Sequence, residues 1–301
     1  MNHNRLPRFV LCALGIAIVV LVGLVVASIA PRIQQARRQA QVVDRIRALD
    51  GKVKYDFQVG ATNAEPGRLQ RLLGDDFFGR VVEVDLTSTG VSDNDLEILH
   101  ELPSMTWLGL YNTSITDRGL QNVGKMHQLE FFWLDSTAVT DAGIRHLVGL
   151  RNLRRLLIQY TAITDGAMAD VARLPNLREL AVAETAVTDK GVKQLARLRL
   201  ESLKLDGTRI TDDSAVVLAG FTQLKHLDLF NTRITDRTLK VASNWKSLQI
   251  LRIHDTGLSD DGIADLSNLQ TLRAVSLGGT SVSEEGAAKL RVALPRCQVF
   301  H

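Results

Sequence analysis

Cysteine is nearly missing from this chain, which has two among 301 residues, Cys12 and Cys297. They stand near opposite ends, and Cys12 falls within a long uncharged run, so they predict no framework disulfide. The sequence also lacks a nucleophile elbow, a phosphate-binding glycine loop and the H-E-x-x-H and C-x-x-C motifs. These absences predict a chain that is not an enzyme and holds no cofactor or metal, although a missing motif is a weaker indication than a present one.

Excess positive charge is confined to one end of the chain. Residues 1–54 hold nine basic and two acidic side chains, whereas the remainder holds 27 basic and 31 acidic. The net charge of +3 therefore describes the N-terminal segment. Because the remainder has no basic excess, we expect no nucleic acid among its partners.

Residues 9–30 are 22 consecutive uncharged positions, long enough to cross a hydrocarbon core of about 30 Å as a helix. After a tail at residues 1–8, they predict an uncleaved single-pass signal-anchor, with a cleaved signal peptide as the alternative. The run exceeds the apolar core of a signal peptide, and Pro31 follows the best cleavage candidate, which favours the anchor. Arginines are more numerous after the span than before it. That bias favours cytoplasmic repeats over exported ones.

Two segments lie between this span and residue 81. Residues 31–50 predict an amphipathic juxtamembrane helix begun by Pro31, which could pair with a second copy, although a plain stalk is favoured because two heptads are short for a coiled coil. Residues 51–80 predict an N-terminal cap. Its expected parts are a strand around Val53 and Tyr55, then a helix begun by Pro66 and ended by Gly74-Asp75-Asp76.

A threonine-centred segment, clearest in residues 112–120, returns nine times within residues 81–293. The interval is 24 residues, with one interval of 23, and the threonines are Thr89, Thr113, Thr137, Thr161, Thr185, Thr208, Thr232, Thr256 and Thr280. A unit this short cannot close a core alone and must stack on its neighbours, so the period predicts a solenoid.

Each unit has one pattern when positions are numbered from its threonine. Apolar residues at −5 and −3 have the period of a strand, and those at +7, +10 and +13 lie on one side of a helix. The threonine or serine at +3 is expected to cap that helix, and the aspartate at +4 to lie at the positive end of its dipole. The recurrent threonine is expected in the turn, satisfying backbone groups of its own and the adjacent unit.

The run L-x-x-L-x-L-x-x-T-x-[IV]-T-D-x-G-[LI] resembles the leucine-rich-repeat family, as at Leu224, Leu227 and Leu229. Its I-T-D-x-G-L half, quoted at 115–120, is similar to the subtype in F-box substrate receptors and bacterial membrane-tethered repeat proteins. This chain departs from the family in having threonine where asparagine or cysteine is common. The resemblance implies an α/β right-handed horseshoe with a concave parallel sheet and convex helices. Residues 294–301 resemble a last cap strand with Cys297 at its buried −5 position.

Aromatic residues, only 5% of the chain, gather at the concave positions −6, −4 and −2 of two units. They predict a partner-binding surface, because exposed aromatic side chains anchor protein interfaces. Alternatively, the cap or the juxtamembrane helix folds over them. The predicted surface comprises Trp107, Tyr111, Phe131 and Trp133, with Leu157 in the next unit.

A secondary concave cluster comprises His226, Asp228, Phe230, Arg252 and His254. Metal binding is disfavoured there because Arg252 would repel a cation, and a cross-strand ion pair between Asp228 and Arg252 is the expected arrangement. The row of aspartates at +4 could indicate calcium-binding sites, but each is expected to interact with the N-terminus of its own helix instead.

Together these features predict a membrane-anchored repeat protein that binds an unknown protein partner through its concave sheet. A substrate-recognition subunit of a degradation machine is the alternative, implied only by the similarity to F-box proteins. About 50 residues between span and repeats leave no room for an F-box-like helical module once stalk and cap are placed. An enzyme with an unrecognised site is less favoured still.

Overall fold

A computed structural model describes the backbone of residues 8–59, 70 and 74–301, and the side chains of the first helix at residues 24, 27, 28 and from 30 onward. That helix, α1 (Arg8–Ala48), runs through Pro31 without a break. The expected boundary between a span and a juxtamembrane helix at residue 31 is therefore not a break in the backbone. A proline inside a helix removes one backbone hydrogen bond and can kink the helix, yet it does not end α1 here.

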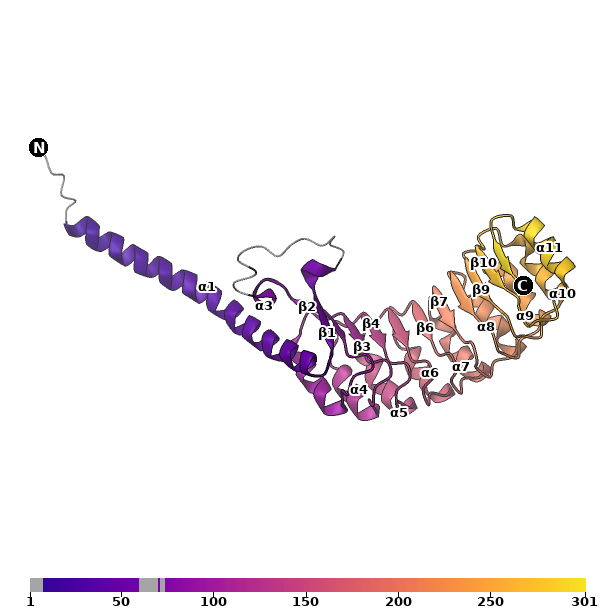
Figure 1. Ribbon diagram of the computed structural model, residues 1–301, viewed down its shortest axis with the longest axis horizontal. Helices are drawn as coiled ribbons and strands as arrows, with labels where there is room; N and C mark the ends of the chain where they lie inside the picture. The colour runs from indigo at the N-terminus through magenta and orange to yellow at the C-terminus, as the bar shows by residue number, and fades with distance from the viewer. Residues whose placement is uncertain (1–7, 60–69, 71–73) are drawn as a thin grey trace, which may run out of the picture.

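The repeats form a curved array with one sheet along its inner side (Figure 1). Ten strands, β2 to β11, are parallel and stand in sequence order, while β1 (Lys52–Tyr55) pairs antiparallel with β2. The parallel strands are β2 (Val81–Asp85), β3 (Trp107–Gly109), β4 (Phe131–Trp133), β5 (Arg155–Leu157), β6 (Glu179–Ala181), β7 (Ser202–Lys204), β8 (His226–Asp228), β9 (Ile250–Arg252), β10 (Ala274–Ser276) and β11 (Gln298–Phe300).

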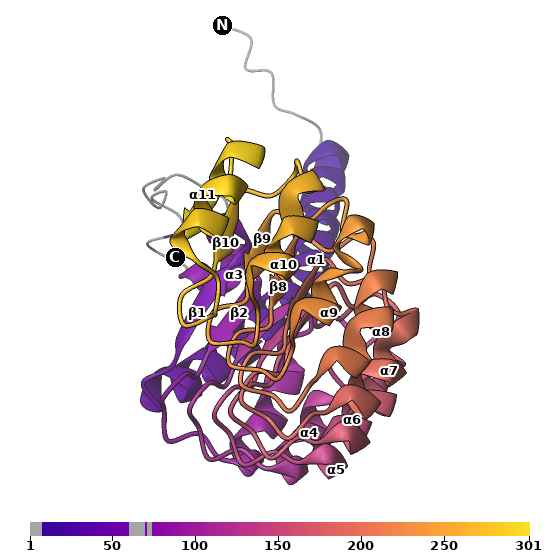
Figure 2. The ribbon, with the colours of Figure 1, turned by 90° about the vertical axis from the view of Figure 1, so that its right-hand side faces the viewer.

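Helices form the outer side of the array and stack in one column, as Figure 2 shows. A strand needs about 4.8 Å per repeat and a helix about 10 Å, so stacking both bends the array toward its strands. The α-helices are α3 (Asp75–Phe78) before the repeats, then α4 (Asp117–Val123), α5 (Asp141–Ile144), α6 (Asp165–Val171), α7 (Asp189–Gln194), α8 (Ala215–Gly220), α9 (Asp236–Leu239), α10 (Asp260–Ala264) and α11 (Glu284–Ala293).

Short 3-10 segments complete several units. They are η1 (Asp56–Gln58), η2 (Asp93–Glu101), η3 (Arg145–Gly149), η4 (Leu195–Arg197), η5 (Asp212–Ser214), η6 (Ala242–Asn244) and η7 (Asp265–Asn268). The side chains at −5, −3, +7, +10 and +13 point between the sheet and these helices. In the unit of Thr113 they are fully buried: Leu108, Leu110, Leu120, Val123 and Met126. The predicted α/β leucine-rich-repeat solenoid is confirmed.

The last turns of α1 cover the N-terminal end of this core. Val42, Val43 and Ile46 are at most 1% exposed, and α1 packs against α3, β1 and η2. Gln39 joins these elements by donating to Asp76 Oδ1 (3.0 Å) and accepting from the backbone N–H of Val81 (3.1 Å). This part of the helix therefore caps the array, and the expected free stalk is not found there. Those apolar side chains are not available to pair with a second copy.

Two predictions for the N-terminal region, the span at 9–30 and the helix from Pro66, fall largely on residues that the structure does not describe. Among the described residues, none of the helices combines the length and apolar character that a membrane crossing requires. The predicted span at 9–30 falls mostly on side chains outside that description, so it stays a prediction. The predicted helix from Pro66 also lies outside the described residues. Gly74-Asp75-Asp76 was expected to end it, but Gly74 precedes α3, which Asp75 begins.

The C-terminal strand has a different register from the expected one. Val299, not Cys297, pairs with Val275, which occupies the −5 position of its unit. The reason is that α11 continues to Ala293, so the strand begins later. Cys297 is therefore not at the buried −5 position, but its free thiol is partly buried and packs against the core.

Eight junctions between repeats carry the same polar contact. The aspartate at +4 of one unit accepts hydrogen bonds from the backbone N–H and the hydroxyl of the +3 residue in the next. At Asp117 these donors belong to Thr140, at 2.8 Å and 2.7 Å. The Thr140 hydroxyl also accepts from the backbone N–H of Ala142 (3.2 Å), which confirms the predicted helix cap. The aspartate lies in the first turn of its own helix, as expected, and it also ties two repeats together, which was not expected.

The junction aspartates also explain the glycine at +6. A Cβ at Gly143 or Gly262 would overlap the carboxylate of the preceding unit's aspartate. Where the chain has a hydroxyl residue at +6, that group donates to the aspartate, as Thr238 does to Asp212 Oδ1 (2.6 Å). The I-T-D-x-G pattern is therefore a joint between units.

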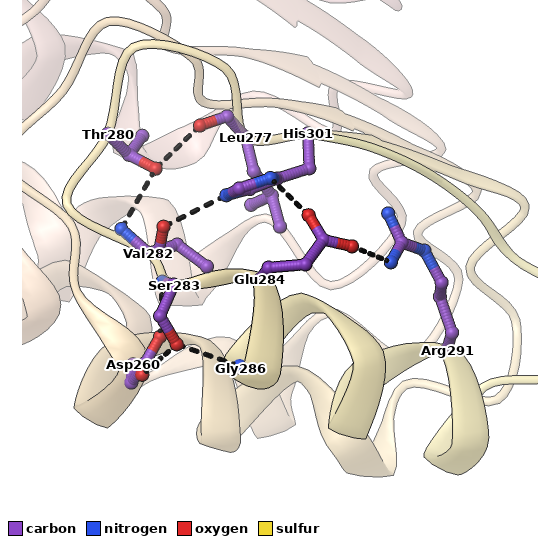
Figure 3. Close-up of polar contacts among 9 residues, drawn as sticks. All are labelled: Asp260, Leu277, Thr280, Val282, Ser283, Glu284, Gly286, Arg291 and His301. Atoms are coloured by element: carbon purple, nitrogen blue, oxygen red, sulfur yellow. Dashed lines mark hydrogen bonds and ion pairs between the residues drawn. The ribbon is translucent and has the colours of Figure 1, made fainter.

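The series of junction aspartates ends in the last unit, where glutamate stands at +4 in place of aspartate (Figure 3). The preceding junction is intact, because the Ser283 hydroxyl donates to Asp260 Oδ2 (2.6 Å). The Glu284 carboxylate makes no such junction contact and instead forms ion pairs with Arg291 (2.8 Å) and with His301 Nδ1 (3.0 Å). His301 Nε2 lies 2.9 Å from the carbonyl oxygen of Val282.

The residue before each recurrent threonine has a left-handed backbone. Its φ lies between +53° and +69° in all nine units, and glycine fills the position only at Gly207 and Gly279. Each recurrent threonine hydroxyl donates to the carbonyl at −3 of its own unit, as Thr113 does to Leu110 (2.7 Å). This bond lies within one unit and does not reach the adjacent one, contrary to the expectation.

Tyr160 is the least suited of these residues to its backbone, since φ is +53° and its ring is 60% exposed. A left-handed residue with a Cβ costs about 1–2 kcal/mol relative to the right-handed form. We expect Tyr160→Gly to raise the free energy of unfolding in urea by roughly 0.5–1 kcal/mol. Tyr160→Ala removes the same ring and keeps the Cβ, so an equal gain from alanine would contradict this cause.

Candidate binding surface

The concave surface is formed by positions −6, −4 and −2 of each unit. Neighbouring strands are in register at these positions, so that Trp107 pairs with Phe131, and Phe131 with Arg155. Each position therefore becomes a row that crosses the sheet, with side chains about 4.8 Å apart. Residues far apart in sequence meet along these rows.

The predicted aromatic residues are brought together as two stacks, here called the aromatic patch together with Leu157. Trp107 stacks on Phe131 with ring centroids 5.2 Å apart and an interplanar angle of 21°. Tyr111 stacks on Trp133 at 5.0 Å and 18°. All four rings and Leu157 are partly exposed. Leu157 pairs in register with Trp133, so the patch covers three neighbouring strands.

Polar and small residues hold the rings in place. A Cβ at Gly109 would overlap the Trp107 ring, so glycine lets this ring lie against the sheet. Trp133 Nε1 donates to Asp135 Oδ2 (2.7 Å), and Asp135 also accepts from the backbone N–H of Gln159 (2.7 Å). Burial raises the pKa of Asp135, while the hydrogen bonds from Gln159 and Trp133 oppose that rise. The patch is thus a preorganised surface.

The alternative, that the N-terminal region folds over these rings, can be compared with the position of α1. The described contacts of α1 with α3, β1 and η2 are at the first turn of the array. In Figure 1, α1 extends away from the sheet face that carries β3 and β4. Among the described residues, the rings are open to a partner.

The secondary cluster forms two separate contacts. Asp228 and Arg252 make the expected cross-strand ion pair, at 2.9 Å between Oδ2 and Nη1. His254 stacks on Phe230 with centroids 4.2 Å apart, and its Nδ1 lies 2.9 Å from the Ser276 hydroxyl. His226 is exposed and takes no part in either contact. Across the described part of the chain, no group of three or more potential ligands is placed to hold a metal ion.

Sequence reasoning overlooked one residue between these clusters, Asp206 at −2 of the β7 unit. It is 7% exposed, and burial raises its pKa to about 6; the nearby charges of Asp228 and Glu184 add to that rise, and Lys204 opposes it. Its signal in the sequence was an acid at a concave position beside a further acid in the next unit. That signal is weak, because Asp135 has the same position and serves only to hold its neighbours.

Comparison with known proteins agrees with this architecture. The family profile described as a leucine-rich repeat matches residues 173–196. No curated protein matches the chain. Internalin C2 of Listeria monocytogenes is similar in structure, with a TM-score of 0.52, 26% identity, and coverage of 69% of this chain and 84% of internalin C2.

Two other solved structures share the fold at lower identity. A leucine-rich-repeat protein of Leptospira interrogans has a TM-score of 0.52 and 18% identity over 72% of this chain and 59% of its own. The ectodomain of the Arabidopsis receptor kinase HAESA, solved with a peptide hormone, has a TM-score of 0.55 and 17% identity over 83% and 46%. This chain therefore spans less than two thirds of both of these proteins.

The repeat pattern, the solenoid and the matched profile define a repeat-array protein with a concave sheet. The chain carries a leucine-rich repeat at residues 173–196 and shares its solenoid fold with solved leucine-rich-repeat proteins.

Proposed function

We propose that this chain binds a protein partner through its concave surface, with the aromatic patch as the centre of the contact. The observation that carries the proposal is the pair of ring stacks, Trp107 on Phe131 and Tyr111 on Trp133. Rigid, partly exposed aromatic side chains provide large contact area at little cost in conformational entropy.

The setting of the patch supports this function over a catalytic one. Its rings are held by Gly109 and by the bond from Trp133 to Asp135, so little ordering is needed when a partner binds. Leucine-rich-repeat domains generally bind proteins. The HAESA ectodomain was solved with a peptide hormone, which supports a polypeptide as the kind of ligand that such an array can take.

We also propose that residues 9–30 anchor the array in a membrane, either facing the cytoplasm or exported. The support is the run of 22 uncharged residues followed by a cluster of arginines. The anchor would place α1 as the element nearest the membrane, since α1 includes both this run and the residues that cap the core.

The double variant Trp107→Ala/Trp133→Ala is expected to weaken partner binding by at least ~100-fold, because each ring would be a buried anchor of the interface. Binding can be measured by photo-crosslinking from Tyr111 in cells, followed by affinity measurement with the crosslinked protein. Val216→Ser, which changes an 81% exposed apolar side chain on α8, is the matched control and should bind as wild type.

The variant must also be shown to fold. Because Trp133 bonds Asp135, we expect a small fall in the midpoint of thermal unfolding for the double variant. A partner that crosslinks to Tyr111 and binds both variants like the wild type would refute the aromatic patch as the contact.

A further inference from the structure

Asp206 differs from the other charged residues on the concave surface. Asp228 pairs with Arg252 at 2.9 Å, and Arg155 pairs with Glu179 at 3.3 Å. Within the described residues, the Asp206 carboxylate has no ion pair and no hydrogen bond from another side chain, and its one donor is its own backbone amide. At 7% exposure, it is a nearly buried acid without a partner.

The surroundings of Asp206 add negative charge. The Glu184 carboxylate lies over Gly207, since a Cβ on that glycine would overlap Glu184 Oε1. On the next strand, Asp228 Oδ1 is sealed from solvent and has no hydrogen-bond partner. Lys204 is the cation that acts on Asp206, lowering its pKa against the effect of burial. We call Glu184, Asp206 and Asp228 the acidic site.

The repeat scaffold does not need an acid at this position. Other units place Gln159, Ala183, Phe230 and Gly278 at −2, with the same strand register and the same turn. Asp135, the other buried acid at −2, accepts three hydrogen bonds from its neighbours, whereas Asp206 accepts none from a neighbour. An unpaired acid in a buried position destabilises the free protein, so structure alone does not account for it.

We propose that the partner places one lysine or arginine side chain on Asp206, between Glu184 and Asp228, while an apolar part of the same segment lies on the aromatic patch. This proposal rests on the proposed function of the concave surface. A basic group supplies the charge and the N–H donors that the acidic site lacks. Arg252 already neutralises one oxygen of Asp228, which leaves Asp206 as the principal acceptor.

The geometry also predicts the spacing within the partner. Trp133 is on β4 and Asp206 follows β7, so the two are separated by three strand spacings, or about 14 Å. An extended polypeptide covers about 3.3 Å per residue. The basic residue is therefore expected about four positions from the apolar residue that contacts Trp133.

The test uses a phage-displayed library of random linear peptides selected on the full chain in mild detergent. Selected peptides are expected to combine an aromatic or aliphatic residue with lysine or arginine about four positions away. Each is then synthesised, together with a version in which methionine replaces its basic residue. Binding of both versions is measured to wild type, Asp206→Asn and Asp213→Asn, the last changing an exposed acid of η5 outside the concave surface.

Asp206→Asn is expected to weaken binding of the basic peptide at least ~10-fold. It should also remove most of the difference in affinity between the basic peptide and its methionine version. Asp213→Asn should leave that advantage unchanged. Lys204→Met should preserve or strengthen binding, because it removes an internal cation that competes for Asp206. The proposal is overturned if replacing the basic residue by methionine lowers the affinity for wild type and for Asp206→Asn by the same factor.

A second measurement separates binding from folding. The folded-state pKa of about 6 lies above the ordinary value of 3.8, so the ionised carboxylate disfavours the fold above about pH 6. The charged groups that act on it are Glu184 in the turn after β6, Lys204 on β7, and Asp228 on β8 with its partner Arg252 on β9. Asp206→Asn should therefore raise the midpoint of thermal unfolding near pH 7.5 while it weakens binding. A fall in both would mark Asp206 as structural and overturn the proposal.

Failure of the proposed function gives a different result. If selected peptides bind Trp107→Ala/Trp133→Ala as well as wild type, the concave aromatic patch is not their site and both proposals fall. If they require the two tryptophans but bind Asp206→Asn as well as wild type, only the acidic site is refuted.

Discussion

Trp245→Ala is expected to lower the free energy of unfolding by about 3–5 kcal/mol, among the largest losses available to a single substitution in this chain. The indole occupies the +13 position between repeats and is completely buried. Its Nε1 donates to the carbonyl oxygen of Leu218 in the preceding unit, at 2.8 Å. Alanine would leave a cavity and would remove one of the two donors to the Leu218 carbonyl, which keeps only the backbone N–H of Phe221 (3.2 Å).

The loss should be concentrated at one end of the array. Each repeat contacts mainly its neighbours, so weakening this junction uncouples the units on its C-terminal side. Hydrogen exchange read by mass spectrometry should show faster exchange in β9 to β11 than in β3 to β6. Trp245→Phe, which fills most of the volume but cannot donate, should lose only about 1–2 kcal/mol beyond any repacking. Equal losses for both variants would mean that the cavity contributes little.

Asp165→Ala is expected to cost about 2–3 kcal/mol, because one carboxylate serves three donors across a junction. It accepts from the backbone N–H and hydroxyl of Thr188, at 2.8 Å and 2.7 Å, and from the backbone N–H of Gly191, at 2.9 Å. Urea unfolding followed by circular dichroism measures the change.

Asp170→Ala provides the matched control on the same helix. Asp170 faces the surface and pairs with the exposed Arg173 at 3.4 Å, so its loss should be within about 0.5 kcal/mol. If Asp165→Ala is as mild as Asp170→Ala, the junction bonds do not stabilise the array beyond their apolar contacts.

Much of the fold could be predicted from the sequence because it follows from periodicity. The leucines at −5 and −3 and the residues at +7, +10 and +13 are buried as expected, and the +3 residue caps its helix. The partner of the +4 aspartate could not be read from one unit, because Asp117 and Thr140 meet only through stacking. The C-terminal register was misjudged because the length of α11 depends on packing that the pattern does not express.

The candidate site was likewise predictable in part. The gathering of Trp107, Tyr111, Phe131 and Trp133 follows from strand alternation, but their stacked geometry depends on Gly109 and Asp135 beneath them. Asp206 was missed because what marks it is the lack of a partner, and partners are assigned only by three-dimensional position. Docking of Val43 and Ile46 on the array was equally hidden, since an amphipathic stripe does not name the surface it will cover.

The polar contact shared by all eight junctions lets whole repeats be exchanged. Every joint from Asp93 to Ser283 uses one acidic acceptor and one hydroxyl residue, so a duplicated unit brings both halves of the bond with it. An array of this kind can lengthen or shorten by whole units without change to its neighbours. Glu284 interrupts that rule, because its carboxylate is already committed to Arg291 and His301. Duplication of a whole unit is thus compatible with the junctions up to Ser283.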